Sequence, residues 1–196
     1  MEVNMLDSTD RILAECKKNL ERGRAVATGI GMFTVLVKMD EMVERFPRSP
    51  QILLRRRLEK YSLLGADLSG KWEMIGGGVE LAHFQCSPAP YQVAILASLL
   101  QELKEEAGLV LATALPKHSF LIPAWLFNEV KGVIDLAFVM PIPWKWVRET
   151  DESRRKFQSG EIRFFHSKEL SKIEIVSPRT SFLIKEAIDY VSHYWP

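Results

Sequence analysis

Residues 76–80 read GGGVE and residues 101–109 read QELKEEAGL, and the segment that leads into the second stretch has a helical pattern. Apolar residues recur there at helical spacing, at Val93, Leu96, Leu99, Leu100, Leu103 and Ala107. Pro90 suits the first turn of this helix, and Gly108 suits the position just past its end. On such a helix Glu102, Glu105 and Glu106 share one face, because positions i, i+3 and i+4 are neighbours.

Three like charges on one helix face repel one another, and two of these glutamates stand near the negative end of the helix dipole. A hard divalent cation held by the carboxylates would offset this cost. The alternative is an acidic, solvent-exposed face beside Lys104, because acidic helix faces are common. The spacing alone leaves both interpretations open.

The glycine run makes a ligand site the better interpretation. It follows residues 71–75, KWEMI, which are strand-like, and glycine lets a backbone approach a ligand or metal closely. Together the two segments resemble the Nudix hydrolase family, whose box reads G-x5-E-x7-R-E-U-x-E-E-x-G-U, with U a bulky apolar residue. Residues 102–109 meet the E-U-x-E-E-x-G-U half in full, and residues 76–80 meet the Gly-Gly-x-Val-Glu opening.

The sequence departs from the family pattern at two places. Gln101 stands where the box has an arginine that helps to hold the acidic cluster, and glutamine cannot supply that charge. The twenty residues between Glu80 and Gln101 also make the spacer longer than in the family, so no residue is assigned to the first glutamate of the box.

The resemblance implies an α/β fold, namely a Nudix-like α/β/α sandwich with a mixed β-sheet. Residues 24–196 would form this domain, and residues 1–23 an extra N-terminal helix that serves packing or dimerisation, which leaves a homodimer open.

The resemblance also implies a function: hydrolysis of the pyrophosphate linkage of a nucleoside diphosphate derivative, such as an ADP-sugar or a nucleoside triphosphate, with Mg²⁺ or Mn²⁺. By this resemblance Glu102, Glu105 and Glu106 are the catalytic metal ligands. One of them, or a later carboxylate at Glu152 or Glu161, would be the general base.

Substrate contacts are expected from Gly77 and Gly78 and from Arg55 and Arg57, and a backbone carbonyl among residues 76–78 would complete the metal shell. Residues 51–58 read as a strand whose alternation puts Arg55 and Arg57 on one face and Arg56 on the other. In Nudix proteins basic residues often end this strand and help to bind phosphates. The alternative is a basic strand at a solvent-exposed sheet edge.

A second functional class stays open, because some Nudix-fold proteins bind nucleotides without cleaving them and act as sensors. The absent arginine and the long spacer favour that class. The three retained glutamates favour the hydrolase, because a binding protein does not need them.

Composition and charge indicate the class of protein, its partners and its compartment. The chain has 196 residues, of which 47% are hydrophobic and 26% charged, as in globular proteins. A net charge of +1 and the lack of a long apolar run favour neither a nucleic acid nor a membrane as partner. The two cysteines, Cys16 and Cys86, form no CxxC pair and suggest a reducing compartment, so we expect a cytoplasmic protein.

The remaining segments alternate between strand-like and helix-like patterns. Strands are expected at residues 28–38, 119–128, 132–141 and 161–165, with 119–141 forming a hairpin. The highly charged residues 150–160 are expected to be a mobile loop, residues 81–90 a loop over the site, and residues 181–194 the last helix.

Overall fold

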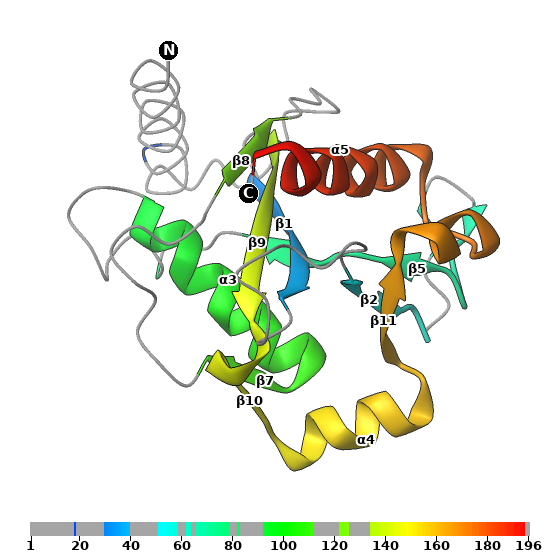
Figure 1. Cartoon of the computed structure of the whole chain (residues 1–196), viewed down its shortest axis with the longest axis horizontal. Coiled ribbons are helices and arrows are strands. Elements are labelled where there is room, and N and C mark those ends of the chain that lie inside the picture. The colour runs from blue at the N-terminus through cyan, green and yellow to red at the C-terminus, as the bar shows by residue number, and fades with distance from the viewer. Residues whose placement is uncertain are drawn as a thin grey trace.

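The computed structural model describes residues 30–39, 51–58, 62–63, 66–78, 92–111, 122–125 and 134–194, together with Lys18 and Ala82. A mixed seven-stranded sheet forms the centre of this part of the chain. Helix α3 (Gln92–Ala107) and helix α5 (Pro178–Tyr194) lie on either side of it (Figure 1). No helix among the described residues is long and apolar enough to cross a membrane.

The sheet is built around strand β1 (Ile30–Met39), which pairs in parallel with β9 (Ile134–Pro143) along its whole length. Its other edge is shared by two antiparallel neighbours, β6 (Ile75–Gly78) near its start and β2 (Gln51–Arg56) near its end. The central path runs β11-β2-β1-β9-β8, where β11 is Ile162–His166 and β8 is Ile122–Trp125. Strand β5 (Trp72–Glu73) adds to β2.

Alternation along the central strands gives the sheet two apolar faces. Val35 and Val37 of β1 pack with Leu183, Ile184 and Ala187 of α5. Leu36, between those two valines, packs on the opposite face with Leu103 and Ala107 of α3. Successive strand residues point to opposite faces, so an unbroken apolar run predicts a strand that is buried on both sides.

These two cores confirm the predicted α/β/α sandwich. The hairpin is also confirmed, because β8 and β9 pair antiparallel. The last helix begins three residues earlier than expected, with Pro178 as its first residue. Ser177 explains this start, because its hydroxyl accepts a hydrogen bond from the amide of Thr180 at 3.1 Å.

The prediction of a mobile loop at residues 150–160 is wrong, because Asp151–Ser159 form helix α4. Thr150 caps its start by accepting a hydrogen bond from the amide of Ser153, and Gly160 ends it with a φ of 74°. High charge does not oppose a helix that has a cap at each end and acidic residues in its first turn.

The structure settles two further points about strands. The strand-like pattern that leads into the glycines continues through them, because Gly76–Gly78 belong to β6 and pair with β1. Of the two interpretations of residues 51–58, the solvent-exposed sheet edge is excluded, because β2 lies between β11 and β1. The basic residues at its end therefore project from the interior of the sheet rather than from a solvated border.

Short elements complete the described fold. A two-stranded sheet joins β7 (Leu109–Leu111), directly after α3, to β10 (Val147–Glu149), directly before α4. The others are β3 (Ser62–Leu63), β4 (Ala66–Asp67) and the 3₁₀ helices η1 (Trp144–Trp146) and η2 (Ser167–Lys172). The predictions for residues 1–23 and for the 81–90 loop fall, apart from Lys18 and Ala82, outside the described residues.

Candidate functional site

A cavity of about 370 Å³ opens where β2, α3, α4 and the start of β11 meet. Acidic side chains from α3 and basic side chains from β2 line it together. The lining residues are Arg55, Arg56, Arg57, Leu58, Glu102, Glu105, Glu106, Lys156 and Glu161. The three predicted glutamates and the predicted arginines therefore lie at one cavity, although α3 and β2 are far apart in the sequence.

Glu102 lies directly over the glycine strand. A Cβ placed on Gly77 would stand 1.8 Å from Oε1 of Glu102, which is far inside van der Waals contact. Only a residue without a side chain can lie there while the carboxylate keeps its position. Gly78, by contrast, has nothing within 4 Å of such a Cβ, so of these two glycines only Gly77 needs to lack a side chain.

Glu106 is held from two sides. Its Oε1 lies 2.6 Å from Nη1 of Arg55, and its Oε2 accepts a hydrogen bond from the amide of Gly76 at 3.1 Å. Burial nevertheless raises the pKa of Glu106 to about 7, because desolvation outweighs the lowering by Arg55 and Gly76, and the charges of Glu102 and Glu73 add to the rise. Glu106 is therefore a carboxyl group poised to titrate near neutral pH.

Arg55 connects this glutamate to a carboxylate that sequence reasoning missed. Its Nη2 lies 2.7 Å from Oε1 of Glu73, whose Oε2 lies 2.7 Å from Nε of Arg57. Arg55 and Glu73 are directly opposed partners of the β2–β5 pairing. That register depends on how the chain folds back after β2, so nothing in the sequence indicated Glu73. Arg55 therefore gives the acidic cluster the positive charge that the side chain of Gln101 cannot supply.

Glu105 is the most accessible member of the cluster. It is exposed, and its Oε1 accepts a hydrogen bond from the side-chain amide of Gln101 at 3.0 Å. Gln101 is exposed as well, one turn before Glu105 on the solvent side of α3. The residue in place of the box arginine therefore contacts Glu105, while Arg55 contacts Glu106.

Lys156 is a second residue of this cavity that the sequence did not indicate. Its buried ammonium donates 2.9 Å hydrogen bonds to the main-chain carbonyls of Glu105 and Glu106, and it pairs with Glu152 at 2.8 Å. These carbonyls belong to the last turn of α3, where no helical amide is left to satisfy them. A cation there opposes the negative end of the helix dipole at the position of the two carboxylates.

The structure distinguishes the two later carboxylates that were candidates for the general base. Glu161 lines the cavity and contacts Ser159 Oγ at 2.8 Å and Arg155 Nη1 at 3.2 Å. Glu152 is exposed, is engaged by Lys156, and does not line the cavity.

The donor set fits a hard divalent cation, because carboxylate oxygens are the ligands that Mg²⁺ and Mn²⁺ prefer. Glu102, Glu105 and Glu106 would hold such an ion, with Glu161 across the same cavity. Within the described residues no three acidic, histidine or cysteine side chains converge closely enough to enclose an ion as they stand.

Comparison with known proteins identifies the fold. No protein-family model matches the sequence, and a search of curated proteins also finds no match. The structure is similar to a MutT/Nudix family protein from Listeria innocua, with a TM-score of 0.52 and 20% identity over 84% of this chain and 94% of that one. It is also similar to RenU, a Nudix hydrolase from M. smegmatis, with a TM-score of 0.50 and 13% identity over 84% of this chain and 86% of that one.

A third similar structure is the C-terminal domain of mouse MUTYH, solved in complex with human PCNA. It has a TM-score of 0.51 and 15% identity over 84% of this chain and 90% of that one. These likenesses confirm the resemblance drawn from the box: the chain has the Nudix fold.

Proposed function

We propose that this protein is a metal-dependent hydrolase that cleaves the pyrophosphate linkage of a nucleoside diphosphate derivative, such as an ADP-sugar or a nucleoside triphosphate. The observation that carries the proposal is the shared cavity, in which three glutamates of α3 face the arginines of β2. A diphosphate is densely anionic, so it needs both cations and arginines to enter a carboxylate site.

Each group of residues has a separate task in this proposal. Glu102, Glu105 and Glu106 hold Mg²⁺ or Mn²⁺, which when bound neutralises phosphate charge and acidifies the attacking water. Arg57 and Arg55 orient the phosphates, and the backbone at Gly77 and Gly78 borders the metal. Lys156 fixes the end of α3, so that the carboxylates keep their places.

Proton transfer is assigned to Glu161, because it is the later-segment carboxylate that lines the cavity. Glu161→Gln keeps the size and removes the basicity, so it should lower kcat by about 100-fold or more. Glu152→Gln is the matched control, with kcat within about threefold of the parent. Equal kcat values for Glu161→Gln and the parent would mean that the general base is one of the glutamates of α3.

The screen that tests the activity uses nucleoside diphosphate derivatives, among them ADP-ribose, ADP-glucose and the nucleoside triphosphates. The products, a nucleoside monophosphate together with pyrophosphate or a sugar phosphate, are separated and measured by ion-exchange chromatography, with Mg²⁺, with Mn²⁺ and with EDTA. We expect turnover with at least one compound that depends on the added metal. Turnover that persists in EDTA would contradict the proposed metal role.

A non-catalytic nucleotide-binding protein is the second candidate. It is favoured by the way Glu106 is already satisfied, because Arg55 and the Gly76 amide engage both of its oxygens. The C-terminal domain of mouse MUTYH, which has a similar fold, was solved in complex with another protein, human PCNA, so this fold also occurs in a binding domain. Micromolar binding of a nucleotide without turnover, for every compound of the screen, would favour this candidate.

We also propose that the protein acts in the cytoplasm. The proposal rests on the two cysteines without a CxxC pair, which suit a reducing compartment. Its natural substrate would then be a soluble nucleotide.

A further inference from the structure

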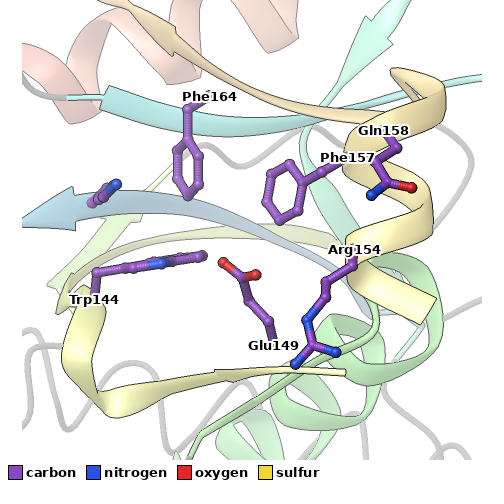
Figure 2. Close-up of a pocket in the computed structure, with 7 residues that line it drawn as sticks. Trp144, Glu149, Arg154, Phe157, Gln158 and Phe164 are labelled. Carbon is purple, nitrogen blue, oxygen red and sulfur yellow. The ribbon is translucent and has the colours of Figure 1, made fainter. Parts of the chain in front are cut away.

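A second cavity of about 370 Å³ lies between helix α4, strand β10 and the sheet (Figure 2). It is lined by Lys38, Trp144, Glu149, Arg154, Phe157, Gln158 and Phe164. None of these residues lines the carboxylate cavity, although α4 contributes to both. The proposed hydrolysis gives this second cavity no role.

Three aromatic rings form its apolar wall. Phe157 and Phe164 are stacked with an interplanar angle of 18° and centroids 5.8 Å apart, and Trp144 meets Phe164 edge-on at 4.9 Å. Trp144 and Phe157 point toward each other across the open centre (Figure 2). Rings held in this way offer flat surfaces on which a planar ligand can stack.

Glu149 places a carboxylate in the same space. Its side chain points between Trp144 and Phe157 (Figure 2), and the residue is only partly exposed. In the described part of the chain it forms no hydrogen bond or ion pair through that carboxylate. A partly desolvated carboxylate beside aromatic rings favours a ligand that donates hydrogen bonds to it.

The other polar groups of this cavity are donors. Lys38 holds its ammonium 5.4 Å from the ring centroids of both Trp144 and Phe164. Helix α4 contributes Arg154 and the side-chain amide of Gln158. The guanidinium of Arg154 also pairs with Asp151. Two cations against one carboxylate disfavour a cationic ligand such as an alkylammonium, which the rings and Glu149 alone would have suited.

We propose that this cavity binds a guanine base, as a site separate from the carboxylate cavity. Guanine is planar and stacks on aromatic rings. It carries two adjacent N–H donors on one edge for the Glu149 carboxylate, and the O6 and N7 acceptors on the other for lysine, arginine or amide donors. Adenine has no N–H on its ring nitrogen N1 and an amino group in place of O6, so it satisfies fewer of these groups.

Guanosine is the probe that tests this site, because it lacks the phosphates that the carboxylate cavity would recognise. Calorimetric titration of the metal-free full chain in EDTA should show binding of one guanosine, with adenosine at least about tenfold weaker. Glu149→Gln should weaken guanosine binding by about 10- to 100-fold, through loss of charge-assisted hydrogen bonds.

Two controls separate this site from the proposed active site and from misfolding. Glu186→Gln changes an exposed glutamate of α5 and should bind guanosine like the parent. Glu105→Gln should also leave guanosine affinity unchanged, whatever it does to turnover. No guanosine binding at millimolar concentration, or equal affinity for the parent and a folded Glu149→Gln, would overturn the proposal.

Discussion

Arg55 contacts two carboxylates at once, Glu73 and Glu106, and both are largely shielded from solvent. Without Arg55, Glu73 keeps its pair with Arg57, whereas the carboxylate of Glu106 loses the arginine that contacts it. Loss of a partner from such a shielded pair costs more than loss from an exposed pair. Arg55→Met should therefore lower the free energy of unfolding by about 1–3 kcal/mol. Urea denaturation of the metal-free protein measures this change.

Arg56→Met provides the control for this prediction on the same strand. Arg56 is exposed, and its Nε donates to the carbonyl of Gly70, so its loss should change stability by no more than about 0.5 kcal/mol. Equal effects of the two substitutions would mean that Arg55 does not hold the acidic cluster.

Glu106 predicts an unusual pH dependence for the metal-free protein. Its pKa of about 7 in the folded state lies above the ordinary value of 4.5, so the folded protein keeps a proton that the unfolded chain releases. The stabilising contribution is complete below pH 4.5 and is lost as the pH rises to 7, by at most about 3 kcal/mol. Between pH 4.5 and pH 7 the titration of Glu106 should thus lower the free energy of unfolding as the pH rises. Most carboxylates have the opposite effect when they lose their proton.

Glu106→Gln removes this titration, because glutamine is uncharged at every pH. Denaturant midpoints at pH 5 and pH 8 in EDTA should then differ less for the variant than for the parent. Identical differences in the two proteins would show that the carboxyl of Glu106 titrates near its ordinary pKa.

One physical reason explains why the sequence predicted some of these residues and not others. Glu102, Glu105 and Glu106 lie on one helix face, and local spacing defines such a face. Glu73 and Lys156 meet the cluster only through tertiary pairing, across β2–β5 and from α4 onto α3, and no local pattern encodes that approach.

At the scale of elements, α4 contacts the end of α3 through a tight junction. Gly108 follows α3 with a φ of 66°, and a Cβ there would stand 2.7 Å from the backbone nitrogen of Ser153. The hydroxyl of Thr150 donates to the carbonyl of Gly108 at 2.7 Å. The preference for glycine just past a helix end predicted the position of Gly108, and α3 does end at Ala107. The contact of Gly108 with α4 was not predicted, because α4 itself was taken for a loop.

Paired glycine substitutions test this junction. Gly108→Ala and Gly160→Ala both place a side chain at positive φ, which costs about 1–2 kcal/mol. Gly160 has open space around its Cβ position, whereas Gly108 meets backbone. Thermal or urea denaturation should therefore show Gly108→Ala to be less stable than Gly160→Ala, by about 1 kcal/mol or more. Equal losses would contradict a close packing of the two helices.

For the whole molecule, the arrangement of three carboxylates predicts that a divalent cation stabilises the fold. A ligand that binds only the folded state adds about 2.7 kcal/mol at one hundred times its Kd. Mg²⁺ or Mn²⁺ should therefore raise the melting temperature of the parent, and this rise should shrink in Glu105→Gln. Melting that is identical with and without either metal would make the site vestigial and favour the non-catalytic candidate.

Gln101→Arg refines this prediction. Because Arg55 already neutralises part of the charge on Glu106, a new arginine at position 101 would act mainly on the exposed Glu105. It should raise the stability of the metal-free protein by less than about 1 kcal/mol. A larger gain would show that Arg55 leaves most of the repulsion in place.

The global fold was predicted more fully than its details. The two-sided apolar strands and the amphipathic helix determine a sandwich, and the box indicated which helix carries the acidic face. The order of the strands and the interior place of β2 depend on long-range pairing, which alternation cannot encode.

Metal-dependent hydrolysis in a matched pair of glycine variants tests the central claim most directly. Gly77→Ala should displace Glu102, because its Cβ would overlap the carboxylate, whereas Gly78→Ala meets nothing within 4 Å. With the best substrate of the screen and saturating Mn²⁺, Gly78→Ala should keep kcat/KM within about threefold of the parent. Gly77→Ala and Glu105→Gln should each lose about 100-fold or more. Equal kcat/KM in all four proteins, or no turnover by the parent, would contradict the claim that this carboxylate cavity is a hydrolytic active site.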